Sequence, residues 1–190
     1  MNTLHSSLEF SHDILKETVT HGDNVIDATV GNGNDTLFLA QLVGQTGHVF
    51  GFDIQKQAIE ATKSKIESSF GVENQVTLFN QSNAEIDNLI PLDTEISSAI
   101  FNLGYLPGGD KSIITTKSAT IPAIQACLSR LTPHGVVVIV VYYGHPGGEE
   151  EKEAVLSFCR QLDQKKFNVL QYGYINQQHN PPILLGIEKR

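Results

Sequence analysis

The sequence lacks several features that mark particular classes of protein. Its 190 residues include only two cysteines, Cys127 and Cys159, and these do not have the close spacing of a metal site. We therefore expect no metal centre and no disulfide, but two reduced thiols in the core of a cytosolic protein. The absence of internal repeats, low-complexity segments and linkers predicts one domain over residues 1–190.

Long apolar segments are also absent. The longest apolar run, residues 136–143, has the length of a strand and is too short to cross a membrane. Residues 1–5 lack the basic and then apolar regions of a signal peptide. These features predict a cytoplasmic protein that has no membrane partner.

Positive charge is scarce, because 13 Lys and Arg residues face 21 Asp and Glu residues and the net charge is −8. Broad, nonspecific binding of nucleic acid depends on many contacts between basic side chains and phosphates, so this balance argues against it. A small RNA footprint remains compatible with the composition. Three local lysine pairs stand out: Lys63/Lys65, Lys111/Lys117 and Lys165/Lys166. We expect the first and third on solvated helix faces or turns.

Strand and helix patterns alternate along the whole chain, which predicts an α/β fold with a mostly parallel sheet and helices on both faces. Seven strands are expected, at residues 24–29, 48–52, 75–79, 96–101, 136–142, 167–175 and 183–188. Helices are expected at residues 4–19, 37–43, 55–70, 86–90, 120–131 and 149–161. A Pro-Pro loop between the last two strands predicts an antiparallel C-terminal hairpin.

A glycine turn follows the first predicted strand, in the segment Val25-Ile-Asp-Ala-Thr-Val-Gly-Asn-Gly-Asn-Asp-Thr36. A strand, a glycine turn and a helix in this order form a loop that binds a cofactor. A dinucleotide fingerprint has a third glycine where this chain has Thr36, and Asp27 and Asp35 would repel a pyrophosphate. S-adenosylmethionine (SAM) has no phosphate; its ammonium and sulfonium suit carboxylates, and its carboxylate suits backbone N–H groups. The loop therefore predicts SAM rather than NAD.

Other cofactor contacts are expected at the carboxyl ends of the next two strands, because ligands of open α/β sheets bind there. Asp53 lies 22 residues beyond Gly31 and is predicted to accept both ribose hydroxyls, with Gln55 beside the same ribose. An N-cap for the following helix is a compatible alternative for Asp53. Ser82 or Asn83 is expected at the adenine edge, with a polar turn as an equal alternative; Asn83 is preferred because its amide donates and accepts.

Asp27, inside the first strand, is predicted to be a buried carboxylate, which needs loop amides or the cofactor's ammonium as a partner. The polar residues of the loop have turn and cap roles as the alternative to cofactor binding. The full set of predicted cofactor-binding residues is Asp27, Thr29, Gly31, Asn32, Gly33, Asn34, Asp35, Thr36, Asp53, Gln55, Ser82 and Asn83.

A second motif, Phe101-Asn-Leu-Gly-Tyr-Leu-Pro-Gly-Gly-Asp-Lys111, follows the fourth strand. It occupies the place where amino-directed methyltransferases carry Asn/Asp-Pro-Pro-Tyr/Phe. The Asn102 side-chain oxygen and the next backbone carbonyl would accept the N–H bonds of an amine and aim its lone pair at the methyl group. Tyr105 would stack on a planar base. Leu103 and Gly104 replace the two prolines, which weakens the analogy with enzymes that methylate adenine or cytosine.

An aliphatic ammonium must lose a proton before it attacks, so a base is expected, and Asp110, His145 and His179 are the candidates. His145 lies in the loop at residues 142–148, Tyr-Tyr-Gly-His-Pro-Gly-Gly, at the same edge of the sheet as the cofactor. The predicted catalytic residues are Asn102, Leu103, Gly104, Tyr105, Asp110 and His145. The predicted substrate-binding residues are Leu106, Gly108, Gly109, Lys111, Lys117, Tyr142 and His145, with the two lysines on phosphates and a surface turn as the alternative.

Residues 27–36, 101–111 and 142–148 together resemble the YtqB/MnmM family of Gram-positive bacteria, and the likeness covers nearly the whole chain. The resemblance implies a Rossmann-like class I SAM-dependent methyltransferase. It implies that the amine of 5-aminomethyl(-2-thio)uridine at wobble position 34 is converted to 5-methylaminomethyl(-2-thio)uridine, with a tRNA anticodon stem-loop as the partner. It assigns SAM-loop roles to Asp27, Asn32, Asn34, Asp35, Thr36, Asp53 and Gln55, and a transfer role to residues 102–105.

The sequence leaves two other functions open. One is a SAM-dependent methyltransferase that acts on rRNA or on a small-molecule amine. The other is a non-catalytic nucleotide-binding protein or an NAD-dependent protein. A homodimer is compatible with the sequence, because the N-terminal helix or the terminal hairpin offers an apolar face.

Overall fold

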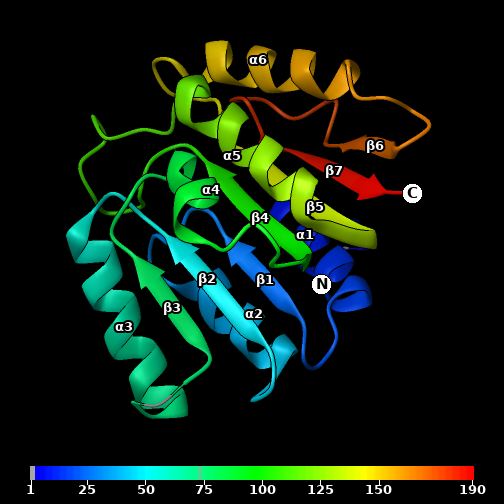
Figure 1. Cartoon of the computed structure of the whole chain (residues 1–190). Helices are drawn as coiled ribbons and strands as arrows, with labels where there is room; N and C mark the ends of the chain where they lie inside the picture. The colour runs from blue at the N-terminus through cyan, green and yellow to red at the C-terminus, as the bar shows by residue number, and fades with distance from the viewer. Residues whose placement is uncertain (1–2, 73) are drawn as a thin grey trace.

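Seven strands form one sheet in the order β3-β2-β1-β4-β5-β7-β6 in this computed structural model, which describes residues 3–72 and 74–190 (Figure 1). The strands are β1 Asn24–Asp27, β2 His48–Phe52, β3 Val76–Phe79, β4 Ile96–Leu103, β5 Leu131–Val141, β6 Phe167–Tyr172 and β7 Ile183–Lys189. Strands β1 to β5 pair in parallel, and β7 pairs antiparallel with both β5 and β6. The predicted mostly parallel sheet with a C-terminal hairpin is confirmed.

Helices cover both faces of the sheet. They are α1 Ser7–Thr18, α2 Asn34–Val43, α3 Lys56–Phe70, the 3-10 turn η1 Asn83–Glu85, α4 Ile86–Leu89, α5 Lys117–Arg130 and α6 Gly148–Arg160. Buried residues of α1 and α2 pack together on one face, and those of α4, α5 and α6 pack on the other, so that the sheet lies between two helical layers (Figure 1). Within the described residues, no helix has the length and apolar character needed to span a membrane.

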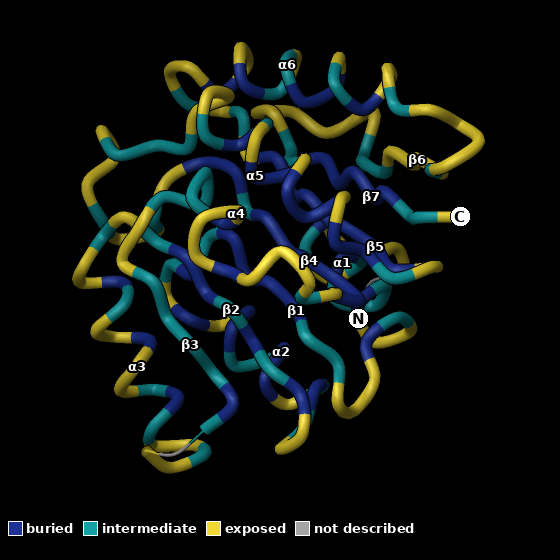
Figure 2. Tube along the Cα trace, in the orientation of Figure 1, coloured by how far each residue is buried: buried dark blue, intermediate teal, exposed yellow. Residues whose placement is uncertain are grey.

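The valine-rich strand β5 explains this double covering. Val136, Val138 and Val140 belong to the core on the α1 and α2 side, while the alternate residues Val137 and Ile139 belong to the other core. A strand that is buried on both faces has this continuous apolar pattern. The opposite situation holds for β6 at the sheet's edge, where four consecutive residues are exposed (Figure 2).

The two cysteines lie where the sequence places them. Cys127 on α5 and Cys159 on α6 are both buried, and neither forms a disulfide. Both belong to the core on the α4, α5 and α6 side of the sheet. Burial raises the pKa of the Cys159 thiol to about 11, because the thiolate would lose its hydration.

Several strand boundaries differ from the predictions: β1 ends at Asp27 rather than residue 29, β6 ends at Tyr172 rather than residue 175, and the changes in β4 and β5 bear on the site. Strand β4 continues through Asn102 to Leu103, two residues beyond the predicted end, because these residues pair with Val140 and Val141 of β5. Strand β5 begins at Leu131, and its pairing with β4 skips residues 132–135 before it resumes at Val136. Proline has no N–H for the sheet, so Pro133 is accommodated in this irregular segment. The extension of β4 places Asn102 inside the sheet rather than in the loop that follows.

Candidate active site

Two adjoining cavities open at the carboxyl ends of the parallel strands. The smaller one, of about 360 Å³, is called here the Asp53 cavity; its wall includes Ala28, Phe52, Asp53, Ile54, Gln55, Ser82, Asn83, Leu106, Ile113, Thr115 and Thr120. The larger one, of about 580 Å³, is called the His145 cavity; its wall includes Leu8, Asn32, Asn34, Asp35, Gly108, Lys111, Tyr142, Gly144, His145 and Asn180. Both cavities are lined by Thr29, Gly31, Asn102, Gly104, Tyr105 and Pro107. These shared residues mark the junction at which two ligands would meet.

The glycine loop owes its shape to two residues with positive φ, Gly31 at 52° and Gly33 at 72°. A Cβ at Gly33 would also lie 2.5 Å from the Thr62 hydroxyl oxygen on α3, so this position tolerates only glycine. Lys65 of the same helix donates to the Asn32 carbonyl at 2.6 Å and to the Asn34 side chain at 2.8 Å. Lys65 lies on a partly exposed face of α3, and its long side chain also reaches the loop, a contact that the sequence analysis did not predict.

Asp53 ties the end of β2 to the glycine loop. One carboxylate oxygen accepts the Gly31 N–H at 2.8 Å, and the other accepts the Gln55 N–H at 2.8 Å. The bond to Gln55 closes a turn before α3 and is not an N-cap, because Gln55 itself is the N-cap residue. Each carboxylate oxygen has a second lone pair, so Asp53 keeps acceptor capacity toward the cavity that it lines.

Ser82 and Asn83 both line the Asp53 cavity. The Ser82 hydroxyl caps η1 by accepting the Ala84 N–H at 3.2 Å. The Asn83 amide nitrogen donates to the Ala28 carbonyl at 3.1 Å, which fixes the side chain against the end of β1. Ser82 therefore has the turn role, and both residues lie on the cavity wall; the adenine-edge role stays a prediction.

Asp27 is fully buried beneath the loop. Its carboxylate accepts the Thr36 hydroxyl at 2.6 Å and the Thr29 N–H at 3.2 Å. Burial, together with the nearby negative charge of Asp35, raises the pKa of Asp27 to about 7. The structure does not bring the predicted cofactor-binding residues Asp27, Gly33 and Thr36 to a cavity wall: Gly33 shapes the loop itself, and Asp27 and Thr36 support it from beneath.

Asn102 lies at the junction of the two cavities. Its backbone N–H donates to the Thr29 hydroxyl at 2.8 Å, and its side-chain nitrogen donates to the Asp35 carboxylate at 2.6 Å. A carboxylate only accepts hydrogen bonds, so this contact assigns the amide orientation and leaves the side-chain oxygen pointing elsewhere. No hydrogen bond among residues 3–72 and 74–190 uses that oxygen, which remains an acceptor for a ligand.

The extension of β4 changes the expected roles of Leu103 and Gly104. The Leu103 carbonyl accepts the Tyr142 N–H at 2.8 Å, so the sheet uses the carbonyl that was expected to bind the amine. The Leu103 side chain is fully buried in the core. A proline at this position would interrupt the strand, whereas leucine lets the pairing with β5 continue. The side-chain oxygen of Asn102 is therefore the acceptor that β4 presents.

Gly104 is held from the other side by a buried network. Its N–H donates to the Thr115 hydroxyl at 2.8 Å, and that hydroxyl donates to Glu151 at 2.6 Å. The second oxygen of Glu151 accepts the Thr120 hydroxyl, also at 2.6 Å, and the residue is only 3% exposed. A buried carboxylate persists when its oxygens are hydrogen-bonded, so α6 fixes the loop that follows β4.

Aromatic side chains stand at the mouth of the His145 cavity. Tyr105 and Tyr142 are 39% and 37% exposed, and the Tyr105 ring meets the His145 ring edge-on at 5.7 Å between centroids. The Lys111 ammonium lies 5.7 Å from the centroid of the Tyr105 ring. These exposed rings can stack on a planar ligand, and the lysine adds a positive charge beside them.

His145 is the one base candidate that the structure brings to the cavity wall among the described residues. Its Nδ1 lies 3.0 Å from the Pro146 carbonyl, which requires a proton on Nδ1 and leaves the lone pair of neutral imidazole on Nε2. Nε2 is buried and has no hydrogen-bond partner among the described residues. A Cβ at Gly148 would lie 2.9 Å from it, so the glycine-rich loop gives the ring its space.

The structure does not bring the other candidates to the site. Asp110 accepts the backbone N–H and the hydroxyl of Ser112, which lowers the pKa of Asp110 and weakens it as a base. His179 lines neither cavity, although its neighbour Asn180 does. Lys117 also lines neither cavity and pairs with Glu150 at 2.5 Å. Gly109 lines neither cavity, whereas Leu106 and Gly108 lie on the walls.

Residues of the site that the sequence analysis missed include Leu8, His12, Thr115 and Glu151. Leu8 lines the His145 cavity, and His12 contacts Asp35 at 2.7 Å. They come from α1 and α6 and from the loop before α5, far along the chain from the residues that they support. No local motif marks them, so only the tertiary structure reveals their roles.

The strand order and the site at the carboxyl ends of β1, β2 and β4 define a class I SAM-dependent methyltransferase. A model of the family described as "Putative rRNA methylase" matches residues 49–188, and the chain belongs to this family. The predicted fold class is confirmed.

Named relatives agree with this assignment. The chain is 39% identical over 189 residues to a "tRNA (mnm(5)s(2)U34)-methyltransferase, chloroplastic" of Arabidopsis thaliana, covering 96% of this chain and 69% of the plant protein. A "putative rRNA-methylase" structure from Clostridium thermocellum has a TM-score of 0.94 and 46% identity, with 100% of both chains covered. A "putative methyltransferase" from Streptococcus mutans, solved in complex with SAH, has a TM-score of 0.89 and 41% identity, covering 99% of this chain and 100% of that one.

Proposed function

We propose that this chain transfers a methyl group from SAM to the amine of 5-aminomethyl(-2-thio)uridine at position 34 of tRNA, giving 5-methylaminomethyl(-2-thio)uridine. The observation that carries the proposal is the Asn102 side chain. Its nitrogen is engaged by Asp35 at 2.6 Å, and its oxygen is available where the two cavities meet. An acceptor in this position suits an N–H group that must be aimed. The name of the plant relative supports this particular amine.

The residues of the Asp53 cavity fit SAM. Asp53 has acceptor capacity for the two ribose hydroxyls, and Gln55 and Asn83 offer amide groups on the same wall. The start of α2, whose Asn34 and Asp35 line the adjoining His145 cavity, supplies backbone N–H groups for the carboxylate of a cofactor that extends to the junction. When bound, SAM supplies an electrophilic methyl group on a positively charged sulfur. The relative solved with SAH supports this assignment.

The acceptor side then has three tasks. Tyr105 and Tyr142 stack on the uracil ring, which enters as a nucleotide turned out of the anticodon loop. The Asn102 oxygen accepts one N–H of the amine, so that the nitrogen lone pair faces the methyl group. Of the predicted bases, His145 lies on the cavity wall and keeps a lone pair on Nε2, but that nitrogen is buried, so it takes the proton that the ammonium must lose only when the loop at residues 144–148 moves. The N–C bond forms as the S–C bond breaks, and the bonding electron pair stays on sulfur.

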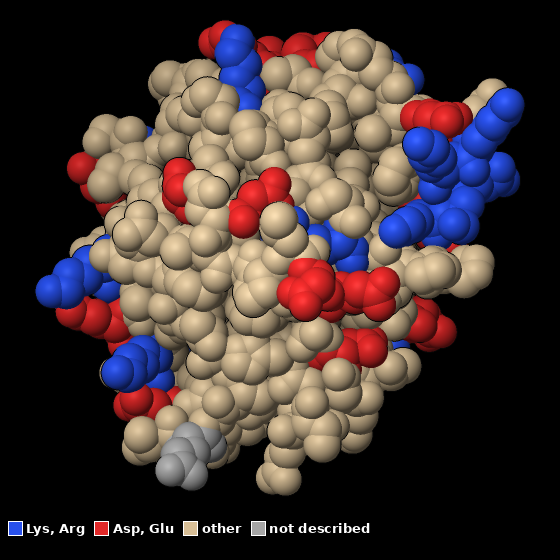
Figure 3. Space-filling model, viewed as in Figure 1, with Lys and Arg blue, Asp and Glu red and all other residues tan. Residues whose placement is uncertain are grey.

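The surface charge favours a small tRNA footprint, such as the anticodon stem-loop. Figure 3 shows basic side chains gathered near the C-terminus and β6, where Lys165, Lys166 and Arg190 are exposed. The pairing of β7 with β5 and β6 places this cluster at the opposite edge of the sheet from the cavities. Lys111 is the lysine on the wall of the His145 cavity among the described residues. Few phosphates can be neutralised near the site, so we expect moderate salt dependence of binding.

The test is incubation of the protein and SAM with tRNA that carries 5-aminomethyluridine, followed by mass spectrometry of the nucleosides. A gain of one methyl group on that nucleoside, with none on tRNA bearing unmodified uridine 34, is expected. Transfer to rRNA or to a small amine, with none to this tRNA, would replace the proposal with the alternative substrate. Calorimetry with SAM and NAD gives a second check, because an NAD-dependent protein would bind NAD instead.

Two further proposals concern the setting of the enzyme. We propose a cytoplasmic location, which the two unpaired cysteines support; the plant relative is described as chloroplastic. The homodimer stays a prediction, for which the exposed Val169 and Leu170 of the edge strand β6 offer an apolar face. Light scattering of the purified protein measures its oligomeric state directly.

A further inference from the structure

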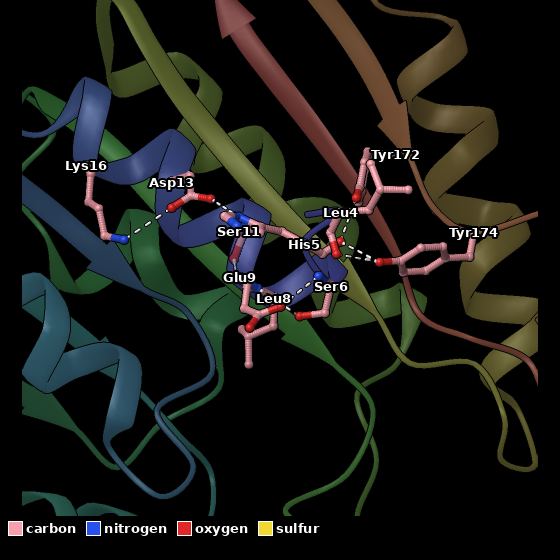
Figure 4. Close-up of polar contacts among 10 residues, drawn as sticks. All are labelled: Leu4, His5, Ser6, Leu8, Glu9, Ser11, Asp13, Lys16, Tyr172 and Tyr174. Carbon is pink, nitrogen blue, oxygen red and sulfur yellow. Dashed lines mark hydrogen bonds and ion pairs between the residues drawn. The ribbon is translucent and has the colours of Figure 1, made fainter. Parts of the chain in front are cut away.

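The N-terminal helix α1 is fastened to the far end of the sheet and leads back to the active site. The Tyr174 hydroxyl donates to the Leu4 carbonyl at 2.8 Å, and the Tyr172 hydroxyl donates to the His5 carbonyl at 2.5 Å (Figure 4). The Ser7 hydroxyl donates to the Pro182 carbonyl at 2.7 Å. These contacts fix the start of α1 against the segments that flank β6 and β7.

The beginning of α1 is also fixed locally. Ser6 accepts the Glu9 N–H, and the Glu9 carboxylate accepts the Ser6 N–H at 2.8 Å, which together form a capping box (Figure 4). Such a reciprocal cap holds the first turn of a helix in place. Farther along, Leu15 is fully buried in the core with Leu39 of α2. The helix is therefore held at both ends, and the residues between them have defined positions.

Between these two anchored regions, His12 reaches the active site. Its Nε2 lies 2.7 Å from one oxygen of Asp35, whose other oxygen accepts the Asn102 amide at 2.6 Å. Since a carboxylate only accepts, the His12 Nε2 must carry a proton. The His12 and Asp35 side chains are 26% and 11% exposed, so water competes little for these bonds. The His12 ring also stacks on Phe38 with 4.3 Å between centroids.

We infer that His12 is a positioning residue for methyl transfer, acting through Asp35 on the amide of Asn102. Asp35 can orient the Asn102 amide only while its own carboxylate is held in one rotamer. His12 holds the second oxygen and thereby fixes the first. The inference rests on the proposed function, because it assigns His12 to the aiming of the amine. The family match at residues 49–188 includes neither His12 nor Asp35.

The experiment compares three variants with the wild type. His12→Phe keeps a ring that can stack on Phe38 but removes the hydrogen bond to Asp35. His12→Gln places an amide N–H near the position of Nε2 and should restore the bond. His5→Phe is the matched control, because it removes another histidine–aspartate pair near the same helix, that with Asp13 (Figure 4), away from both cavities.

We expect kcat to fall about ten- to a hundredfold in His12→Phe, as misaiming of a reacting group does. The Kd for SAM and the thermal midpoint should stay close to wild-type values, and His12→Gln should recover most of the turnover. His5→Phe should keep wild-type turnover. Unchanged turnover in His12→Phe, or an equal loss in both His12 variants, would overturn the inference.

A measurement without substrate separates this inference from the proposed function. The side-chain amide of Asn102 gives a pair of NMR signals, identified by their loss in Asn102→Ala. These signals should shift in His12→Phe and return toward their wild-type positions in His12→Gln. Signals that stay in place in His12→Phe would overturn the positioning role. Wild-type protein that fails to methylate the tRNA would instead overturn the proposed function.

Discussion

The two cavities of the site are built in different ways. The Asp53 cavity is shaped by bonds at the ends of neighbouring strands, such as those from Asp53 to Gly31 and Gln55. The His145 cavity is assembled from α1, the glycine loop and the start of α2, the end of β4, the loops after β4 and β5, and Asn180. Backbone geometry therefore prepares the cofactor side, whereas side-chain contacts between distant segments prepare the acceptor side. Substitutions in the Asp53 cavity should therefore lower the affinity for SAM, and substitutions in the His145 cavity should lower turnover.

The largest difference between the effect on turnover and the effect on SAM affinity is expected for Asn102→Ala. Loss of the oxygen that aims the amine should lower kcat about a hundred- to a thousandfold, the range for removal of one preorganised polar group. The Kd for SAM, measured by calorimetry, should change less than about threefold, because Asp53 and Gln55 are untouched. A parallel loss of SAM affinity would mean that the two cavities do not act independently. Unchanged turnover would show that the amine is aimed by another group.

The opposite result, a loss of SAM affinity with little change in kcat, is expected for Asp53→Ala. Two hydrogen bonds that hold the loop are lost, together with the acceptor for ribose, so SAM affinity should fall about a hundredfold. At saturating SAM, kcat should stay within a few-fold of the wild type. Asp53→Asn keeps one acceptor oxygen and should lie between the two proteins. Turnover that remains low at saturating SAM would assign Asp53 a role on the acceptor side as well.

The sequence located the glycine turn and the strand end that form the Asp53 cavity, for a physical reason, whereas the list of cofactor-binding residues stays a prediction. The glycine loop and Asp53 belong to units of strand and turn, whose conformations depend on residues close together in the chain. Helix α3 was also predicted correctly, but the contact of Lys65 with the loop depends on how α2 and α3 pack. Local sequence patterns determine where helices and strands form, whereas the packing of those elements determines which groups a long side chain contacts.

The acceptor side was predicted only in part. The motif containing Asn102 was identified, but its extension into β4 depends on pairing with Val140 and Val141 of β5. That pairing also explains why the Leu103 carbonyl is used by the sheet. The partners His12 and Glu151 lie far from β4 along the chain, one before it and one after it, and no periodicity links them to that strand. Contacts over such separations form only when the complete fold brings the segments together.

A smaller effect, on the free energy of unfolding, is expected when the pH changes the protonation of Asp27, which is buried beneath the glycine loop. Its folded-state pKa of about 7 exceeds the ordinary value of 3.8, so the folded protein binds a proton that the unfolded chain has released. Stability from this group is complete below about pH 4 and is lost as the pH rises through 7. The free energy of unfolding of wild type relative to Asp27→Asn should fall by about 1 kcal/mol per pH unit in this window. Urea titrations at pH 5, 6, 7 and 8 measure it, and a constant difference would contradict the raised pKa.

The smallest effects, on RNA affinity and its salt dependence, should distinguish Lys111 from Lys117, which the sequence analysis treated as a pair. Lys111 lines the His145 cavity, so Lys111→Ala should weaken binding of the anticodon stem-loop a few-fold and reduce the salt slope by about 1, as loss of one phosphate contact does. Lys117 is paired with Glu150 and lines neither cavity, so Lys117→Ala should leave the affinity and the slope unchanged. Fluorescence anisotropy with a labelled stem-loop at several salt concentrations measures both quantities. Equal losses for the two variants would extend the RNA footprint from the cavity mouth to the start of α5.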